Sequence, residues 1–188
     1  RQGKGTIEDP YLIYTAEDLN NIRYSLYAHF KLMNNIDMTT SDYASSFTTI
    51  SDFHGSLDGN GYKIKGLNIS ASGLFATADS ITIKNLTLDG PSIKATSNSY
   101  VGLLIGKATG TTNIENVKIL GTINLNGSSD VGGIVGYSTG TIVLDQITIP
   151  STMTVTGSSN YIGGLVGEAE TVTITNSGVK GTVKTTSG

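Results

Sequence analysis

Four polar side chains, two of which could carry acid–base chemistry, recur at a regular spacing along the chain. They are Lys84, Glu115, Asp145 and Thr175, which follow one another at intervals of about 30 residues. If each interval is one turn of a coiled stack, Glu115 and Asp145 stand on adjacent coils, roughly 5 Å apart at the backbone. Two carboxyl groups at that separation could act as an acid–base pair or hold a cation. A simpler interpretation, which we favour, is an exposed ion pair between Lys84 and Glu115 with Asp145 as a solvated neighbour.

Tandem repeats are the elements that would position this row. A segment of the form Gly-apolar-apolar-Gly occurs within 131–136 and 162–167, again within 101–106 with Leu103 in place of the first Gly, and in degenerate form at 72–75. The three full copies begin about 30 residues apart, and repeats of this length are single supersecondary units that bury their apolar side chains only against their neighbours. The spacing therefore predicts a stack of coils.

A second marker keeps the same period a little further downstream. Its amide side chains belong to Asn85, Asn116, Gln146 and Asn176, which are again separated by one repeat length each. Stacked coils would place one amide above another, so that side-chain hydrogen bonds could run along the axis. We expect these four residues to form a structural ladder.

Each repeat contains three short segments that favour strands joined by tight turns. They are the Gly-apolar-apolar-Gly segment, the segment that carries the amide residue, and a third such as 121–125 or 181–184. Three strands in about 30 residues are typical of an all-β parallel β-helix. We expect the coils to occupy residues 53–188 and to continue beyond this chain, which opens with Arg1. The chain would then be a monomeric fragment of a larger protein.

Residues 1–52 differ from the repeats and predict an N-terminal cap that contains a first strand. Thr15 followed by Asp18 indicates a helix start, and Leu19, Ile22 and Leu26 form one apolar stripe. These positions predict a short helix over 16–27 that covers the open end of the stack. Such a cap protects strand edges that would otherwise pair with other chains.

Composition excludes several classes of partner. The 188 residues carry a net charge of −3 with only 14% charged residues, so the chain lacks the basic surface that nucleic acid or an anionic membrane requires. No apolar run is long enough for direct membrane insertion. Without Cys, disulfides and thiol chemistry are also excluded.

The residues resemble a known family pattern. Gly164-Leu-Val-Gly167 and Gly133-Ile-Val-Gly136 resemble the GLUG motif of bacterial cell-surface adhesins, and the segment from Gly5 to Leu19 resembles the one that commonly precedes such repeats. The resemblance implies a right-handed parallel β-helix displayed outside a bacterial cell. It is specific for architecture rather than for activity.

Two further rows should face outward and could bind a ligand. One contains Tyr100, Asp130 and Tyr161, and the other contains Lys107, Tyr137 and Glu168. Tyrosine rings beside acidic groups can stack on a sugar and hydrogen-bond to its hydroxyls. Tyrosine is also ordinary on strand surfaces, so the rows alone do not establish a site.

Other polar segments have structural interpretations. Asp58-Gly-Asn-Gly61 lacks the later bidentate acid of a calcium loop and is more typical of a turn. His29 and His54 have no partner at metal-ligand spacing. We therefore expect no metal and no cofactor.

The leading functional hypothesis is a non-catalytic structural or adhesive module of a bacterial surface protein. Its partner would be a glycan or a host extracellular-matrix protein. The alternative is a β-helical enzyme that cleaves polysaccharides with Glu115 and Asp145. A third hypothesis, binding to ice or mineral through flat Thr rows, fits less well because Thr175 aligns with acidic residues rather than with Thr.

Overall fold

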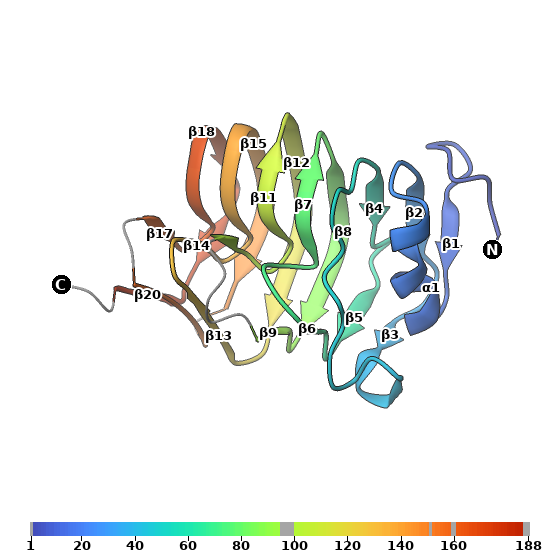
Figure 1. Ribbon diagram of the computed structural model, residues 1–188, viewed down its shortest axis with the longest axis horizontal. Coiled ribbons are helices and arrows are strands. Elements are labelled where there is room, and N and C mark those ends of the chain that lie inside the picture. The colour runs from blue at the N-terminus through green and yellow to red at the C-terminus, as the bar shows by residue number, and fades with distance from the viewer. Residues whose placement is uncertain (1, 95–99, 151, 159–160, 186–188) are drawn as a thin grey trace.

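The chain folds as a parallel β-solenoid of about five turns, which confirms the predicted fold class. The computed structural model describes residues 2–94, 100–150, 152–158 and 161–185. The coils follow one another along the long axis, with the N-terminal strand at one end (Figure 1). Every pairing between named strands is parallel.

Strands at equivalent positions of successive coils pair with one another and form sheets. One long sheet has the order β1-β2-β4-β8-β12-β15-β11-β7, with β3, β5, β18 and β19 joined to its side. Its strands are β1 (Tyr11–Ile13), β2 (His29–Leu32), β3 (Ile36–Asp37), β4 (Ser56–Asp58), β5 (Lys63–Lys65), β7 (Phe75–Asp79), β8 (Thr82–Asp89), β11 (Ile105–Thr109), β12 (Thr111–Leu120), β15 (Val135–Ile149), β18 (Val166–Thr175) and β19 (Gly178–Val179).

Three smaller sheets complete the coils. The predicted third strand of the repeat is present as β13 (Ile123–Gly127), β16 (Met153–Gly157) and β20 (Thr182–Thr185). A shorter sheet that the sequence did not predict contains β10 (Tyr100–Val101), β14 (Asp130–Gly132) and β17 (Tyr161–Gly163). The remaining pair is β6 (Asn68–Ile69) with β9 (Ser92–Ile93).

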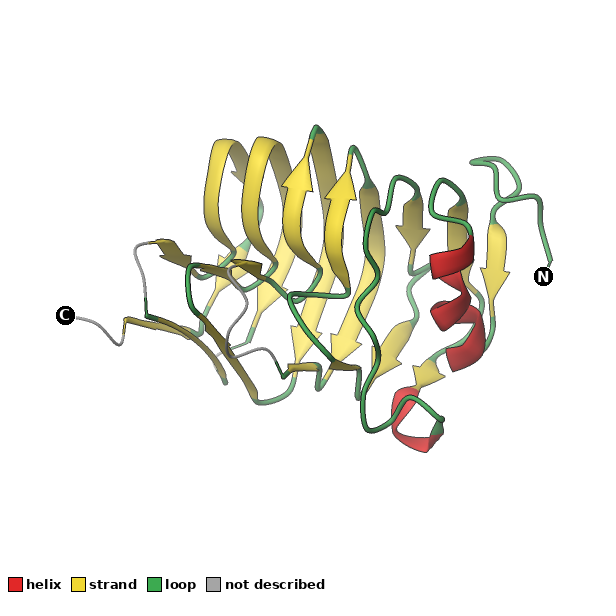
Figure 2. Cartoon of the chain, in the orientation of Figure 1, coloured by secondary structure: helices red, strands yellow, loops and turns green. Residues whose placement is uncertain are grey.

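The N-terminal helix begins where the sequence predicts. Thr15 accepts a hydrogen bond from the backbone N–H of Asp18, and the Asp18 carboxylate accepts one from the N–H of Thr15, which together form a capping box. The helical segment consists of α1 (Ala16–Asn20) and the 3₁₀ helix η1 (Asn21–Tyr24). Figure 2 shows it together with the other short helical turn, η2 (Met38–Thr40).

The helix is shorter than the predicted range of 16–27. Ser25 leaves the helical conformation, and the carbonyl of Leu26 instead accepts a hydrogen bond from the N–H of His54 on the next coil. A hydrogen bond between coils therefore replaces the helical hydrogen bond that the Leu26 carbonyl would otherwise accept, and the helix ends before this residue. Leu19 and Ile22 are fully buried, and Arg23 donates to the carbonyl of Thr48, so the helix replaces one side of the first coil.

Stacked apolar rows form the core. Near the N-terminus the interior row is aromatic, and the rings of Phe53 and Phe75 stack at 4.2 Å. The same row continues as the aliphatic Ile105 and Val135, both fully buried. In the last described coil Val166 continues this row, and the neighbouring row, which runs from Ile83 through Leu144, ends in Ile174 at 46% exposure.

Glycines allow the coils to approach closely at one corner. A Cβ atom on Gly136 would lie 2.6 Å from the backbone nitrogen of Val101 and 2.7 Å from the carbonyl oxygen of Gly106. Both neighbours are backbone atoms and cannot rotate away. Close approach between coils therefore explains why the repeat requires this glycine.

The coils are not all the same length. Ser138 pairs with Ala169, and Thr141 pairs with Thr171, so Thr139 and Gly140 lie opposite the single residue Glu170. The irregularity falls between two strand segments whose register is otherwise regular. The extra residue is therefore accommodated at a corner.

We predict that Gly136→Ala lowers the free energy of unfolding by roughly 1–3 kcal/mol, because the added methyl group would overpack a rigid backbone contact. Gly178→Ala is the matched control, since no atom lies within 4 Å of the Cβ that it would add. Urea denaturation of the two variants measures the difference. Equal stabilities would contradict the close-approach explanation.

Candidate functional site

The row predicted from the sequence, Lys84, Glu115, Asp145 and Thr175, which we call the carboxylate row, is present in the structure as neighbouring strand positions. Strand pairing places Lys84 beside Glu115, Glu115 beside Asp145 and Asp145 beside Thr175. The expected ion pair between Lys84 and Glu115 does not form among the described side chains. Strand pairing thus brings the four positions into line.

The Asp145 carboxylate accepts hydrogen bonds from two residues of the next coil. Its Oδ1 accepts hydrogen bonds from Thr175 Oγ1 at 2.8 Å and from Asn176 Nδ2 at 2.9 Å. The bonds from Asn176 and Thr175, with a smaller contribution from the backbone of Gln146, lower the pKa of the Asp145 carboxyl. A general acid needs the opposite shift, so the geometry does not favour the polysaccharide-cleaving alternative.

The four amide residues mark a corner of the coil. Asn85, Asn116, Gln146 and Asn176 all have positive φ, between 50° and 57°. Asparagine tolerates this left-handed conformation better than most residues do. The sequence showed the spacing of these residues but not the backbone turn that explains their identity.

The amides form a broken ladder. Asn116 Nδ2 donates to Asn85 Oδ1 at 3.0 Å, and Asn85 Nδ2 donates to Asp58 Oδ1 at 3.3 Å. Asn176 donates to Asp145 instead of to Gln146. The structure therefore brings Asn85 and Asn116 together, and among the described residues the Gln146 side chain takes no part in the hydrogen-bonded run.

The two tyrosine-containing rows meet at a corner between the short sheet and the long one. Strand pairing aligns Tyr100, Asp130 and Tyr161 in one row and Lys107, Tyr137 and Glu168 in the other. We call Tyr100, Tyr161, Lys107, Tyr137 and Glu168 the tyrosine–acid surface. It extends over the three coils that contain β10, β14 and β17.

Aromatic stacking joins the two rows. The rings of Tyr100 and Tyr137 stack with centroids 4.9 Å apart, and the Lys107 ammonium lies 5.9 Å and 5.8 Å from the two centroids. Tyr161 is 46% exposed.

Burial, the charge of Glu168 and nearby Tyr100 raise the pKa of the Tyr137 hydroxyl. Tyr137 therefore remains a neutral hydrogen-bonding group at physiological pH.

Asp130 is the exception to the outward orientation that the sequence predicted. Only 4% of its surface is exposed, because its strand lies at a tightly packed corner. Its Oδ2 accepts a hydrogen bond from Ser129 Oγ at 2.9 Å. Asp130 thus lies beneath the tyrosine–acid surface rather than on it.

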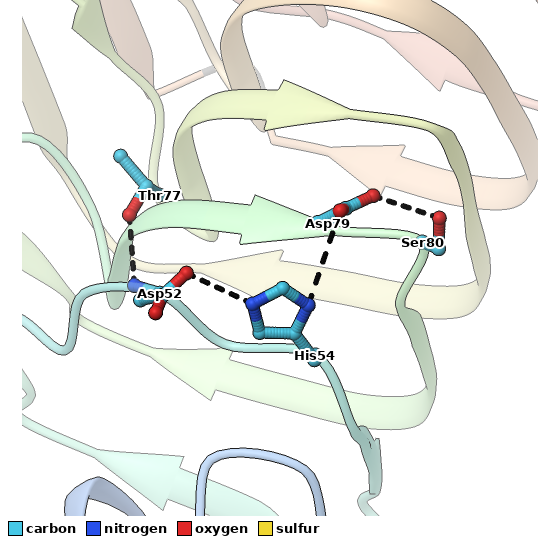
Figure 3. Close-up of polar contacts among 5 residues, drawn as sticks. All are labelled: Asp52, His54, Thr77, Asp79 and Ser80. Atoms are coloured by element: carbon cyan, nitrogen blue, oxygen red, sulfur yellow. Dashed lines mark hydrogen bonds and ion pairs between the residues drawn. The ribbon is translucent and has the colours of Figure 1, made fainter.

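The structure contains a polar cluster around His54 that the sequence did not predict. His54 Nε2 lies 2.8 Å from Asp52 Oδ1, and its Nδ1 lies 3.9 Å from Asp79 Oδ2 (Figure 3). The backbone N–H of Asp52 donates to Thr77 Oγ1, and Ser80 Oγ donates to Asp79 Oδ1. Because Ser80 bonds to Asp79 rather than to His54, the cluster does not form an activated nucleophile.

The spacing explains why this cluster was missed. The bridge between Phe53 and Ala78 joins positions that are closer in sequence than one full repeat, so the periodic pattern does not align them. His54 also stacks on Tyr27, with ring centroids 4.3 Å apart. The cluster therefore links the first coils and lines a hollow of about 240 Å³ that Lys107 also borders.

A second aromatic surface lies at the N-terminal end. A hollow of about 550 Å³ is lined by Tyr11, Arg23, Tyr24 and Tyr27, among others. Tyr24 is 73% and Tyr27 is 72% exposed. Sequence analysis assigned Tyr27 to the helix, so this grouping was not foreseen.

Comparisons with known proteins show which family this chain belongs to. A family model described as the M26 IgA1-specific metallo-endopeptidase N-terminal region matches residues 12–121, which is more than half of the chain. The chain belongs to this family of N-terminal regions. A second model, the GLUG motif, matches residues 158–184 and supports the resemblance found in the sequence.

Individual relatives cover much of this chain. Halomucin of Haloquadratum walsbyi is 37% identical over 144 residues, which is 66% of this chain and 2% of halomucin. A "Putative Gly-rich membrane protein" of Evansella cellulosilytica is 36% identical over 132 residues, which is 62% of this chain and 15% of that protein. The chain thus spans only a small part of either relative.

A solved structure shares the fold. The crystal structure of a "putative immunoglobulin A1 protease" from Bacteroides ovatus matches with a TM-score of 0.66 at 17% identity. The match covers 97% of this chain and 69% of that one. At this identity the similarity concerns the fold alone.

The family description mentions a metallo-endopeptidase, whose metal centre would need several ligating side chains around one ion. No group of three or more His, Cys, Asp or Glu within the described ranges could hold a metal ion. The chain has no Cys, and its His29 is bonded to Ser56. These residues do not fit a protease metal centre.

None of the described helices is long and apolar enough to cross a membrane.

We predict that Asn116→Ala lowers the free energy of unfolding by about 1–2 kcal/mol, because alanine is disfavoured at positive φ. Asn116→Gly should cost less, since glycine adopts this conformation without strain and loses only the amide bonds. Chemical denaturation of both variants separates the two contributions. A glycine variant as unstable as the alanine variant would show that backbone conformation is not the cause.

We predict that Asp145 contributes to an acid-dependent loss of stability. Its pKa is lower in the folded than in the unfolded chain, so its contribution is present above the ordinary value of 3.8 and is lost as pH falls through the folded pKa. Asp145→Asn should flatten the fall in melting temperature below about pH 4. Thr175→Val, which removes one donor, should flatten it partly. Superimposable melting curves for the parent and Asp145→Asn would rule out this contribution.

Proposed function

We propose that this chain is a non-catalytic, rigid segment of a bacterial cell-surface protein that presents a ligand-binding face. The ligand would be a glycan or a glycosylated extracellular-matrix protein of a host. The observation that carries the proposal is the tyrosine–acid surface, in which strand pairing assembles Tyr100, Tyr137 and Tyr161 beside Glu168. These side chains come from separate repeats and meet only because the coils stack.

The chemistry of this surface suits a sugar. A pyranose ring offers an apolar face to an aromatic ring and hydroxyls to neighbouring polar groups. Tyr161 provides exposed aromatic area, while the Tyr137 hydroxyl and the Glu168 carboxylate provide hydrogen-bonding groups. Because parallel strands hold these residues, little conformational entropy would be lost on binding.

Family membership supports a role in presentation rather than in chemistry. The matched family is an N-terminal region, and one relative is named as a membrane protein. A location outside the cell agrees with these names and is part of the proposal. The absence of converging acids and bases in the carboxylate row, as far as the described side chains extend, also favours binding over cleavage.

We predict that Tyr137→Ala and Tyr161→Ala each weaken binding to a glycan array or to immobilised matrix proteins by about tenfold, equivalent to about 1.4 kcal/mol. Tyr14→Ala, at the far end of the solenoid, is the aromatic control and should bind like the parent. Circular dichroism checks that all variants retain the fold.

Two results would contradict the proposal. If the parent binds nothing in either assay, the segment is a spacer without a ligand. If Tyr24→Ala abolishes binding while Tyr137→Ala and Tyr161→Ala do not, the ligand uses the N-terminal hollow instead.

A further inference from the structure

The Asp130 carboxylate is buried and incompletely bonded. Its Oδ2 accepts a hydrogen bond from Ser129, whereas Oδ1 has no hydrogen-bond partner in the part of the chain that the structure describes. Only 4% of the residue is exposed. A buried carboxylate oxygen without a partner is costly, and such groups usually pair with a donor or coordinate a cation.

A second carboxylate approaches it from the next coil. The backbone packs closely here, since a Cβ on Gly167 would lie 3.1 Å from the carbonyl carbon of Asp130. Glu168 follows Gly167 in the chain, so it lies next to this close contact, and its carboxyl interacts with that of Asp130. Burial, followed by the interaction with Asp130, raises the pKa of the Glu168 carboxyl. Two acidic groups are therefore held together on adjacent coils.

No basic side chain neutralises this pair among the described residues. The ion pairs that form there join His54 to Asp52 and Asp79, and Lys63 to Asp89. Lys107 lies in the same row as Glu168 but is placed over the rings of Tyr100 and Tyr137. The pair thus has negative charge, oxygen atoms and an unsatisfied acceptor, and no cationic side chain of the described residues is paired with it.

We propose that a divalent cation of the calcium type bridges Asp130 Oδ1 and the Glu168 carboxylate. Hard cations of this kind prefer carboxylate oxygens, and water can complete their coordination. With only two protein side chains as ligands, binding should be weak, in the range of about 10⁻⁴–10⁻³ M that is typical of extracellular modules. The bridge joins β14 to β18 and goes beyond the proposed ligand-binding role.

The test is a calcium titration of the melting temperature near pH 7, compared with sodium chloride at matched ionic strength. Saturating calcium, at roughly 10 mM or above, should raise the melting temperature of the parent by roughly 5 °C. Asp130→Asn and Glu168→Gln should each lose this rise. Glu170→Gln, which changes an exposed acid two positions away, should retain it. Isothermal titration calorimetry should give one bound calcium ion per chain.

A folding defect can be distinguished from a lost site. Without calcium, Asp130→Asn should melt no lower than the parent, because the amide removes an unpaired buried charge at nearly unchanged volume. The proposal is overturned if calcium fails to stabilise the parent, or if both variants keep the full calcium response. It is also overturned if acidification to about pH 5 stabilises the calcium-free parent while calcium has no effect, since a shared proton would then satisfy the pair.

Discussion

The parallel hydrogen bonding of each coil to the next is the constraint on which the rest of this structure depends. Once residue 115 pairs with 84 and 145, the neighbours of every other side chain in those strands follow. Interior positions become continuous apolar rows, and exterior positions become rows of polar groups. Amides at positive φ turn the corner, and glycines allow the next strand to pack closely. A change in either feature would affect the alignment of several coils at once.

The repeat explains why so much of the fold could be predicted. A period of about 30 residues is visible in the sequence, and parallel stacking converts it directly into spatial neighbours such as Tyr137 and Glu168. The helix end could not be predicted, because the Leu26 carbonyl bonds to His54 rather than continuing the helical pattern. The burial of Asp130 also depends on side-chain direction in the short strand β14, for which the alternating pattern is too brief to be informative.

The candidate site shows a division between polar groups that hold the coils together and polar groups that remain accessible. Asp145 accepts hydrogen bonds from Thr175 and Asn176, so its carboxylate is held by the next coil although its strand position is aligned with that of Glu115. Tyr161 remains exposed, although it lies in register with the buried Asp130. Sequence spacing identifies neighbours well, but only the contacts show which of them are free to meet a ligand. Fold similarity alone does not supply that distinction.

The unequal coils at the corner after Ser138 have an evolutionary consequence. Because Thr139 and Gly140 lie opposite the single residue Glu170, the coil tolerates a small insertion there without moving the apolar rows. Gene duplications that add or remove whole coils therefore need not be perfect copies, since small differences in length can be taken up where strands bend. Proteins that share this architecture can therefore differ in the number of coils and in the residues at their corners while they keep the same interior rows of apolar side chains.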